Sequence, residues 1–290
     1  MASAYASTFP KPVNDIKRRR MKMKHSKTGE PLFTSLTSFY GSTLDYIFYT
    51  VDSLEVEGLL ELPDFESVGR ALPSPLWSSD HIALMGSFRI TRPFLVKLQG
   101  AYDELEKVGY SVAYKKKTGT GLYTCTLGSG YTFDGCATFY RNDIFMEAKS
   151  YQLEFSQSAL SLIDKLELGL RKDALKRLIK DNVALIVILE VVGNFAKSAA
   201  SSSRLCAAST KSAASSSRLC VVNTHIFADV NFADVKLLQV SDLINAIELS
   251  QKTIDPRMPL FICGDMNSIP GSDPYILLTK HEVNLHVHRH

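Results

Sequence analysis

Short apolar runs separated by polar turns alternate along the chain with segments of helical periodicity. Runs of apolar or β-branched residues predict strands at 45–50, 82–90, 110–115, 134–141, 183–190, 218–224 and 259–263. Apolar residues that recur at intervals of three and four predict helices at 100–108, 156–163, 171–180 and 234–251, and a short one from Pro274 through Leu278. With 290 residues, 45% of them hydrophobic, the chain can bury one large α/β core or two smaller ones.

The most informative polar residues follow the apolar run at 259–263. Asp265 and Asn267 lie two residues apart, so on an extended backbone they point to the same side. A carboxylate and a carboxamide are the hard oxygen ligands that suit Mg²⁺. This strand end is therefore a candidate metal site.

Three other strands carry polar residues of the same kinds. Asp45 lies within an aromatic strand, the pair Asp80-His81 leads into an apolar strand, and another strand ends with Asn223 and His225. Four strands that each deliver metal-binding or phosphate-binding side chains predict one shared site.

Four short motifs carry a resemblance to a known superfamily. Gly-Asp-Met-Asn-Ser at 264–268, Asn-Thr-His at 223–225, the segment 44–50 and the segment 78–84 resemble the endonuclease/exonuclease/phosphatase superfamily, which has the fold of deoxyribonuclease I. Longer stretches are similar to the plant carbon catabolite repressor type poly(A) deadenylases, and they lie at 31–34, 59–62, 72–75, 134–139 and 178–184. The likeness covers most of the chain outside residues 195–220.

The resemblance implies a deoxyribonuclease I-like four-layer sandwich of the α/β (α+β) class, with two mixed β-sheets flanked by helices. The order of the motifs differs from that family, because the strands that close its domain come first in this chain. We therefore expect a permuted, incomplete domain: a basic segment at 1–30, closing strands at 31–92, and the family's middle region at 98–290. A Ser/Ala-rich repeat loop interrupts the last part at 196–217, since residues 197–206 recur at 211–220.

The family's chemistry is Mg²⁺-dependent 3′ to 5′ hydrolysis of poly(A), with one or two ions. By resemblance, Asp265, Asn267 and His81 would bind metal or the scissile phosphate, Asp45 would orient a histidine, and His225 would donate on the phosphate side. Substrate contacts would come from Tyr40, which could stack on an adenine, and from Asn223 and Asp80. The implied partners are single-stranded RNA and a multi-subunit deadenylase complex.

Two ligands of the family site are missing. The opening strand that carries an Asn ligand has no counterpart, and where the family reads Leu-Gln-Glu-Val this chain has Gly100 in place of the metal-binding glutamate. Losing that charge predicts an impaired enzyme. The alternative is an inactive relative or a fusion of two gene fragments, acting at most as a module that binds RNA or a deadenylase complex.

Each candidate residue also has a structural interpretation. Asp265 and Asn267 alone would be a turn, Asp80-His81 an exposed step before a strand, and His225 a strand-end histidine. For Tyr40, core packing competes with base stacking. The matched family segments favour the functional interpretation of the Asp-Met-Asn motif.

Charge, cysteines and hydropathy set the remaining bounds. A net charge of +3 does not by itself predict nucleic-acid binding, although basic runs occur at 17–24 and 115–117. The five cysteines form no CxxC pair, which favours reduced thiols in an intracellular protein. No apolar run reaches the length of a membrane span, and we expect a protein of the nucleus and cytoplasm.

Overall fold

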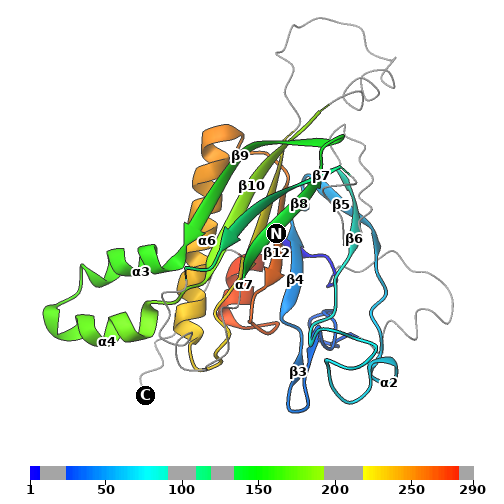
Figure 1. Ribbon diagram of the computed structural model, residues 1–290, viewed down its shortest axis with the longest axis horizontal. Coiled ribbons are helices and arrows are strands. Elements are labelled where there is room, and N and C mark those ends of the chain that lie inside the picture. The colour runs from blue at the N-terminus through cyan, green and yellow to red at the C-terminus, as the bar shows by residue number, and fades with distance from the viewer. Residues whose placement is uncertain (7–23, 91–108, 119–133, 193–217, 281–290) are drawn as a thin grey trace, which may run out of the picture.

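The computed structural model describes residues 1–6, 24–90, 109–118, 134–192 and 218–280 (Figure 1). A six-stranded mixed sheet is its central element, with the order β1-β4-β12-β11-β10-β9. The strands in that order are Ala2–Ser3, Asp45–Tyr49, Leu260–Asp265, Arg218–His225, Val183–Val191 and Phe145–Glu154. The sheet therefore combines strands from both ends of the chain.

One pair in the sheet is parallel, and a long helix explains it. Strands β11 and β12 run in the same direction, whereas every other pair in the sheet is antiparallel. A parallel pair needs a long crossover connection, and α6 (Ala233–Ile254) supplies it. Its Val240, Leu243 and Ile247 pack on β-strand residues that include Val222 and Ile262.

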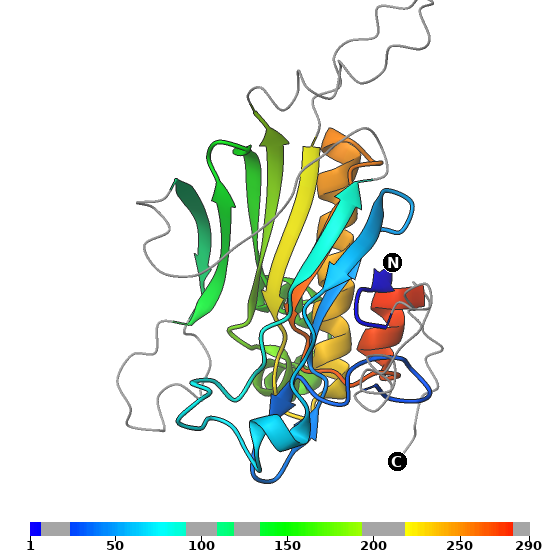
Figure 2. The same cartoon turned by 90° about the vertical axis from the view of Figure 1, so that its right-hand side faces the viewer.

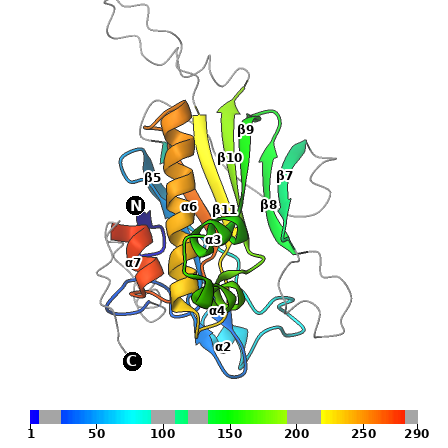
Figure 3. The ribbon, with the colours of Figure 1, turned by 90° about the vertical axis from the view of Figure 1, so that its left-hand side faces the viewer.

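Helices cover one face of the sheet (Figure 3). Next to α6 lies α7 (Asp273–Lys280), and α3 (Phe155–Ile163) and α4 (Leu168–Leu178) form a second helical pair. Phe155, Leu243 and Leu278 are buried in the core between these helices and the sheet. None of the described helices is long and apolar enough to cross a membrane.

Two hairpins cover the opposite face of the sheet, which Figure 2 shows from another side. The first pairs β5 (Leu54–Leu59) with β6 (Gly86–Ile90), and the second pairs β7 (Tyr110–Lys116) with β8 (Gly135–Arg141). Phe88 of β6 packs edge-on against Phe261 of β12, with ring centroids 4.8 Å apart. Leu54, Ala113 and Cys136 join the same core, which places both hairpins in one layer.

A small third core supports the loops beside the end of β4. Strands β2 (Ser35–Leu36) and β3 (Gly41–Ser42) form a short hairpin, and α2 (Phe65–Val68) lies next to it. Phe33, Leu36 and Ile82 are buried in this core together with Val68 and Leu72. It holds the segment that precedes β6 close to the main sheet.

The predicted α/β class, with a mixed sheet flanked by helices, is confirmed. In the described residues two separate hairpins stand in place of the second sheet. The helices, the six-stranded sheet and these two hairpins form three layers, whereas four were expected. The helix expected at 100–108 and the repeat loop at 196–217 fall outside the described residues. The ends of the segment 1–30 take part in the core: β1 pairs with β4, and the buried Glu30 accepts hydrogen bonds from Ser3 and Tyr275.

One strand begins later than predicted and one strand was not predicted, each for a physical reason. The strand expected at 82–90 begins only at Gly86, because Ile82 is buried in the small third core, where its N–H binds the Thr34 carbonyl. The ten-residue strand β9 was not predicted. Every residue of β9 except Phe145 is exposed or half-buried at the sheet edge, so its apolar pattern is weak, and it is held by pairing along the length of β10.

Candidate active site

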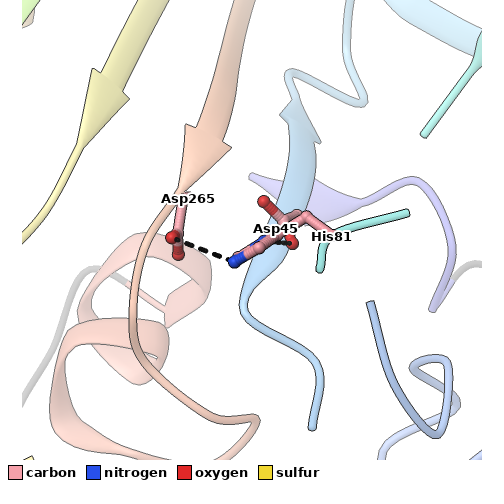
Figure 4. A group of neighbouring side chains, drawn as sticks. All are labelled: Asp45, His81 and Asp265. Carbon is pink, nitrogen blue, oxygen red and sulfur yellow. Dashed lines mark hydrogen bonds and ion pairs between the residues drawn. The ribbon is translucent and has the colours of Figure 1, made fainter. Parts of the chain in front are cut away.

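Neighbouring strands place three polar side chains in one row across the sheet. Asp265 at the end of β12 lies opposite Asp45 of the antiparallel β4 and opposite His225 of the parallel β11. The three positions are therefore adjacent in space although Asp45 and Asp265 are far apart in sequence. Figure 4 shows Asp45 and Asp265 converging with His81, which comes from the loop before β6.

The glycine before Asp265 is needed for the close approach of β12 and β11. Gly264 has φ +136, and a Cβ built on it would lie 2.0 Å from the Thr224 carbonyl oxygen. A side chain there would force the strands apart. Glycine at this position therefore lets β12 stay paired with β11 up to its last residue, with Asp265 in register.

The motif then turns sharply, and the turn also belongs to the site. Asn267 has φ +45, its backbone N–H donates to Asp265 Oδ1 at 2.8 Å, and its Nδ2 donates to the Ile226 carbonyl at 2.8 Å. The structural interpretation of this motif as a turn is correct in geometry. The same geometry leaves Asp265 Oδ2 and the Asn267 amide oxygen as the oxygens that can bind a cation.

His81 is held by a carboxylate. Its Nδ1 lies 2.8 Å from Asp45 Oδ2, and its Nε2 lies 4.0 Å from Asp265 Oδ2. The hydrogen bond with Asp45 raises the pKa of His81 to about 9 against the opposing effect of burial. His81 is therefore an imidazolium at neutral pH, with its second N–H pointing toward Asp265.

His225 lies on the other side of Asp265 in the opposite electrostatic setting. Burial lowers the pKa of His225, and the positive charge of Lys117 lowers it further. Lys117 Nζ lies 3.4 Å from His225 Nδ1 and forms an ion pair with Asp134. The other nitrogen of His225, Nε2, is 3.7 Å from Asp265 Oδ2. The site thus holds one charged and one neutral histidine around a single carboxylate.

Asp265 itself is strained electrostatically. Burial and the neighbouring Asp45 charge raise the pKa of Asp265 to about 6, although the Asn267 N–H and His81 oppose this. Because burial disfavours the ionised form of Asp265, a cation bound beside it would stabilise that form. Perturbed acids of this kind in a pocket are typical of functional sites.

These residues line a pocket of about 680 Å³. Seven of the eight predicted site residues are among its lining residues, which are Ser35, Tyr40, Leu44, Asp45, Asp80, His81, His225, Ala228, Val230, Asp265 and Asn267. Asn223 is not. Its side chain donates to the Ala137 carbonyl at 2.7 Å, and so it fastens β8 to β11 instead of facing the pocket.

Two exposed side chains with apolar surface line the pocket. Tyr40, on the turn between β2 and β3, is 43% exposed, and Val230, after β11, is 74% exposed. Core packing, the alternative for Tyr40, does not describe this side chain, and its neighbour Phe39 is 99% exposed. Both positions are available to a flat apolar ligand group.

The donor set fits a hard divalent cation. One ligand atom from each of Asp45, His81 and Asp265 lies within 4.8 Å of the others. His81 could bind a cation only as the neutral ring, because an imidazolium offers no lone pair, whereas the carboxylate of Asp265 and the amide oxygen of Asn267 are oxygen groups suited to Mg²⁺. His81 is suited to an anionic oxygen. Gly100, which by resemblance is expected where the family has its glutamate, lies outside the described residues.

Three residues near the site escaped the sequence prediction. Lys117 and Asp134 flank His225 from the second hairpin, and Lys236 of α6 hydrogen-bonds to the Asn267 carbonyl. The basic run at 115–117 was a signal for Lys117, although the run indicated a surface patch. Lys236 sits among apolar helix residues and gave no signal.

Comparison with known proteins gives carbon catabolite repressor protein 4 and angel homologues. The chain is 39% identical to carbon catabolite repressor protein 4 homolog 2 of Arabidopsis thaliana over 184 residues, covering 62% of this chain and 27% of that protein. It is 29% identical to the CCR4-Not complex 3′-5′-exoribonuclease subunit Ccr4 of Yarrowia lipolytica, over 63% of this chain and 26% of that protein. The chain thus spans about a quarter of the length of these relatives. No family model matches it.

Solved structures show a partial likeness. The catalytic domain of human nocturnin with a bound sulfate anion aligns with a TM-score of 0.40 and 18% identity, covering 60% of this chain and 48% of that one. ANGEL2, a 2′,3′-cyclic phosphatase in complex with adenosine-2′,3′-vanadate, aligns with a TM-score of 0.39 and 25% identity, covering 60% and 37%.

Proposed function

Because the chain belongs to the endonuclease/exonuclease/phosphatase superfamily, in its carbon catabolite repressor type branch, we propose that its pocket is the active site of a Mg²⁺-dependent 3′ to 5′ exoribonuclease acting on poly(A). The observation that carries the proposal is the row of Asp45, Asp265 and His225, with His81 bridging the two acids. The name of the Yarrowia relative calls that protein a 3′-5′-exoribonuclease subunit of the CCR4-Not complex.

The protein's own groups divide the chemistry among them. The oxygens of Asp265 and Asn267 would hold the cation, which when bound would offset phosphate charge and lower the pKa of an attacking water. His81, kept protonated by Asp45, would donate a hydrogen bond to a phosphate oxygen. His225, held neutral, can exchange a proton through Nε2.

The pocket walls suit a single-stranded nucleotide. Tyr40 and Val230 present apolar surface, on which an unpaired base can stack without the geometry of a duplex. Asp80 also lines the pocket, and its carboxylate can accept a hydrogen bond from a ribose hydroxyl. These contacts support single-stranded RNA as the substrate class, and stacking on Tyr40 would accept adenine without selecting it.

We further propose that catalysis is slow in this chain. Gly100 replaces the family's metal-binding glutamate, and removing one charged group that acts in the transition state costs about 100-fold in rate or more. The competing function, an inactive module that binds RNA or a deadenylase complex, rests on the same substitution. Association with such a complex is also a proposal, suggested by the name of the Yarrowia relative.

The test is shortening of a 5′-labelled RNA with an A-tail by the purified chain. We expect slow removal of 3′ nucleotides in Mg²⁺, none with EDTA, and none with Asp265→Ala. Gly100→Glu is the matched gain variant, and it should accelerate shortening. Asp173→Ala, an exposed change on α4, should leave the rate unchanged.

The two functions predict different results. If neither the wild type nor Gly100→Glu shortens the RNA, and wild type and Asp265→Ala bind oligo(A) equally, the exoribonuclease proposal is wrong and the binding module is favoured. Shortening that persists in Asp265→Ala or in EDTA would show that cleavage comes from another site or a contaminating nuclease.

A further inference from the structure

A buried lysine lies beneath the turn that follows β12. Lys236, in the first turns of α6, is only 6% exposed. Lysine is rarely buried unless its ammonium is paired, because leaving water is costly for a charge. Its contacts therefore identify what it stabilises.

The ammonium joins two segments of the pocket wall. Lys236 Nζ donates to the Asn267 carbonyl at 2.6 Å and to the Ala228 carbonyl at 3.3 Å. The first carbonyl belongs to the turn that carries Asp265, and the second belongs to the segment after β11 that leads to Val230. One side chain thus connects the proposed metal-binding turn to the neighbouring segment after β11.

The turn has a specific need for such a partner. Asn267 has φ +45, a left-handed conformation that residues with a side chain seldom adopt, although asparagine adopts it more often than most. The turn also directs the Asn267 N–H to Asp265 Oδ1, so its conformation decides where that carboxylate points. A donor on the Asn267 carbonyl stabilises this arrangement from the side away from the pocket.

We propose that Lys236 is a positioning residue, which holds the turn at 265–267 and the segment at 226–230 in the relative arrangement that binds the cation and the substrate. It does not face the pocket itself, since it is absent from the lining residues. The alternative is a purely structural lysine that anchors α6. The inference rests on the proposed function for the effect of Lys236 on binding of the cation and the substrate. Whether Lys236 holds the turn can be measured without activity.

The experiment compares Lys236→Met, which keeps the length and removes the donors, with two controls on the same helix. Lys252→Met removes an exposed lysine whose side chain is 69% exposed. Leu243→Ala destabilises the core at a residue that does not line the pocket. For each protein we would measure amide hydrogen exchange of residues 264–268 without metal, the Kd for Mg²⁺ by calorimetry, and Tm.

In Lys236→Met we expect exchange at 264–268 to accelerate about tenfold and the Kd for Mg²⁺ to rise about 10-fold to 100-fold. Lys252→Met should change neither, and Leu243→Ala should lower Tm while leaving the Kd of the folded protein unchanged. If Lys236→Met lowers Tm but leaves local exchange and the Kd at wild-type values, Lys236 is only structural and the proposal is wrong. If wild type binds no Mg²⁺ at all, the proposed function fails, and the exchange measurement alone decides whether Lys236 holds the turn.

Discussion

Asp265→Asn should make the metal-free protein more stable at neutral pH while it abolishes metal-dependent cleavage. The pKa of Asp265 stands at about 6 against an ordinary 3.8, and each pKa unit corresponds to about 1.4 kcal/mol. The ionised side chain, which is 15% exposed, thus costs the fold up to about 3 kcal/mol. Asparagine keeps an acceptor for the Asn267 N–H and removes the charge. We expect a net gain in the free energy of unfolding of about 1 to 3 kcal/mol.

The sign of the pH dependence follows from the direction of the shift. Between about pH 4 and pH 6 the native state holds a proton on Asp265 that the unfolded chain has released, so wild-type stability falls as pH rises through this window. Above about pH 6 the cost is complete, and below about pH 4 it is absent. The gain from Asp265→Asn should therefore be present at about pH 7.5 and vanish near pH 4.

Urea unfolding in EDTA at several pH values measures this difference directly. Asp173→Asn makes the same chemical change at an exposed position of α4 and should alter stability by less than about 0.5 kcal/mol at every pH. Asp265→Asn that is less stable than wild type at about pH 7.5, or a gain that stays constant down to about pH 4, would refute the electrostatic reasoning.

Asp45→Asn should destabilise the protein by about 1 to 3 kcal/mol at about pH 6 and by much less near pH 10. The raised pKa of His81 contributes stability that is fully present below about pH 6.5 and is lost as pH rises through about 9. Equal losses at both pH values in urea unfolding would contradict this. Gly264→Ala should cost about 3 kcal/mol or more, since its Cβ would meet the Thr224 carbonyl, and an unchanged Tm in a thermal melt would show that the strands can separate without penalty. Tyr40→Ala should raise KM for A-tailed RNA about tenfold with kcat and Tm unchanged, whereas Tyr40→Phe should behave as wild type; a loss confined to kcat would argue against stacking.

The buried strands could be predicted from the sequence because their composition reflects their surroundings. β10 and β12 are apolar runs covered on both faces, and both were predicted within about two residues. β9 is an edge strand with alternating charges, and only its pairing with β10 makes it a strand. β5 was missed although Leu54–Leu59 alternates apolar and acidic residues at its start, a pattern that predicts a strand.

For the site, residue types could be predicted but their electrostatics could not. Motifs found Asp45, His81, His225 and Asp265, because each stands at or near a strand terminus. Nothing local shows that His81 is charged and His225 neutral, since this depends on Asp45 for one and on burial beside Lys117 for the other. Such contacts join residues that are separated by dozens to hundreds of positions.

The two departures from the family pattern, the order of the segments and the glycine expected in place of a glutamate, have different physical consequences. The order of the segments affects only the connections, because the pairing of β4 with β12 depends on complementary faces and hydrogen bonds, and the entropy of closing a loop grows slowly with its length. Asp45 and Asp265 meet in register in this chain although Asp45 comes first. The glycine at position 100, which by resemblance is expected at the family's glutamate position, would instead remove a charge that no rearrangement of the chain replaces. Activity that is recovered by Gly100→Glu alone would therefore separate the two, since it would show that the altered order is tolerated and that the missing carboxylate limits the rate.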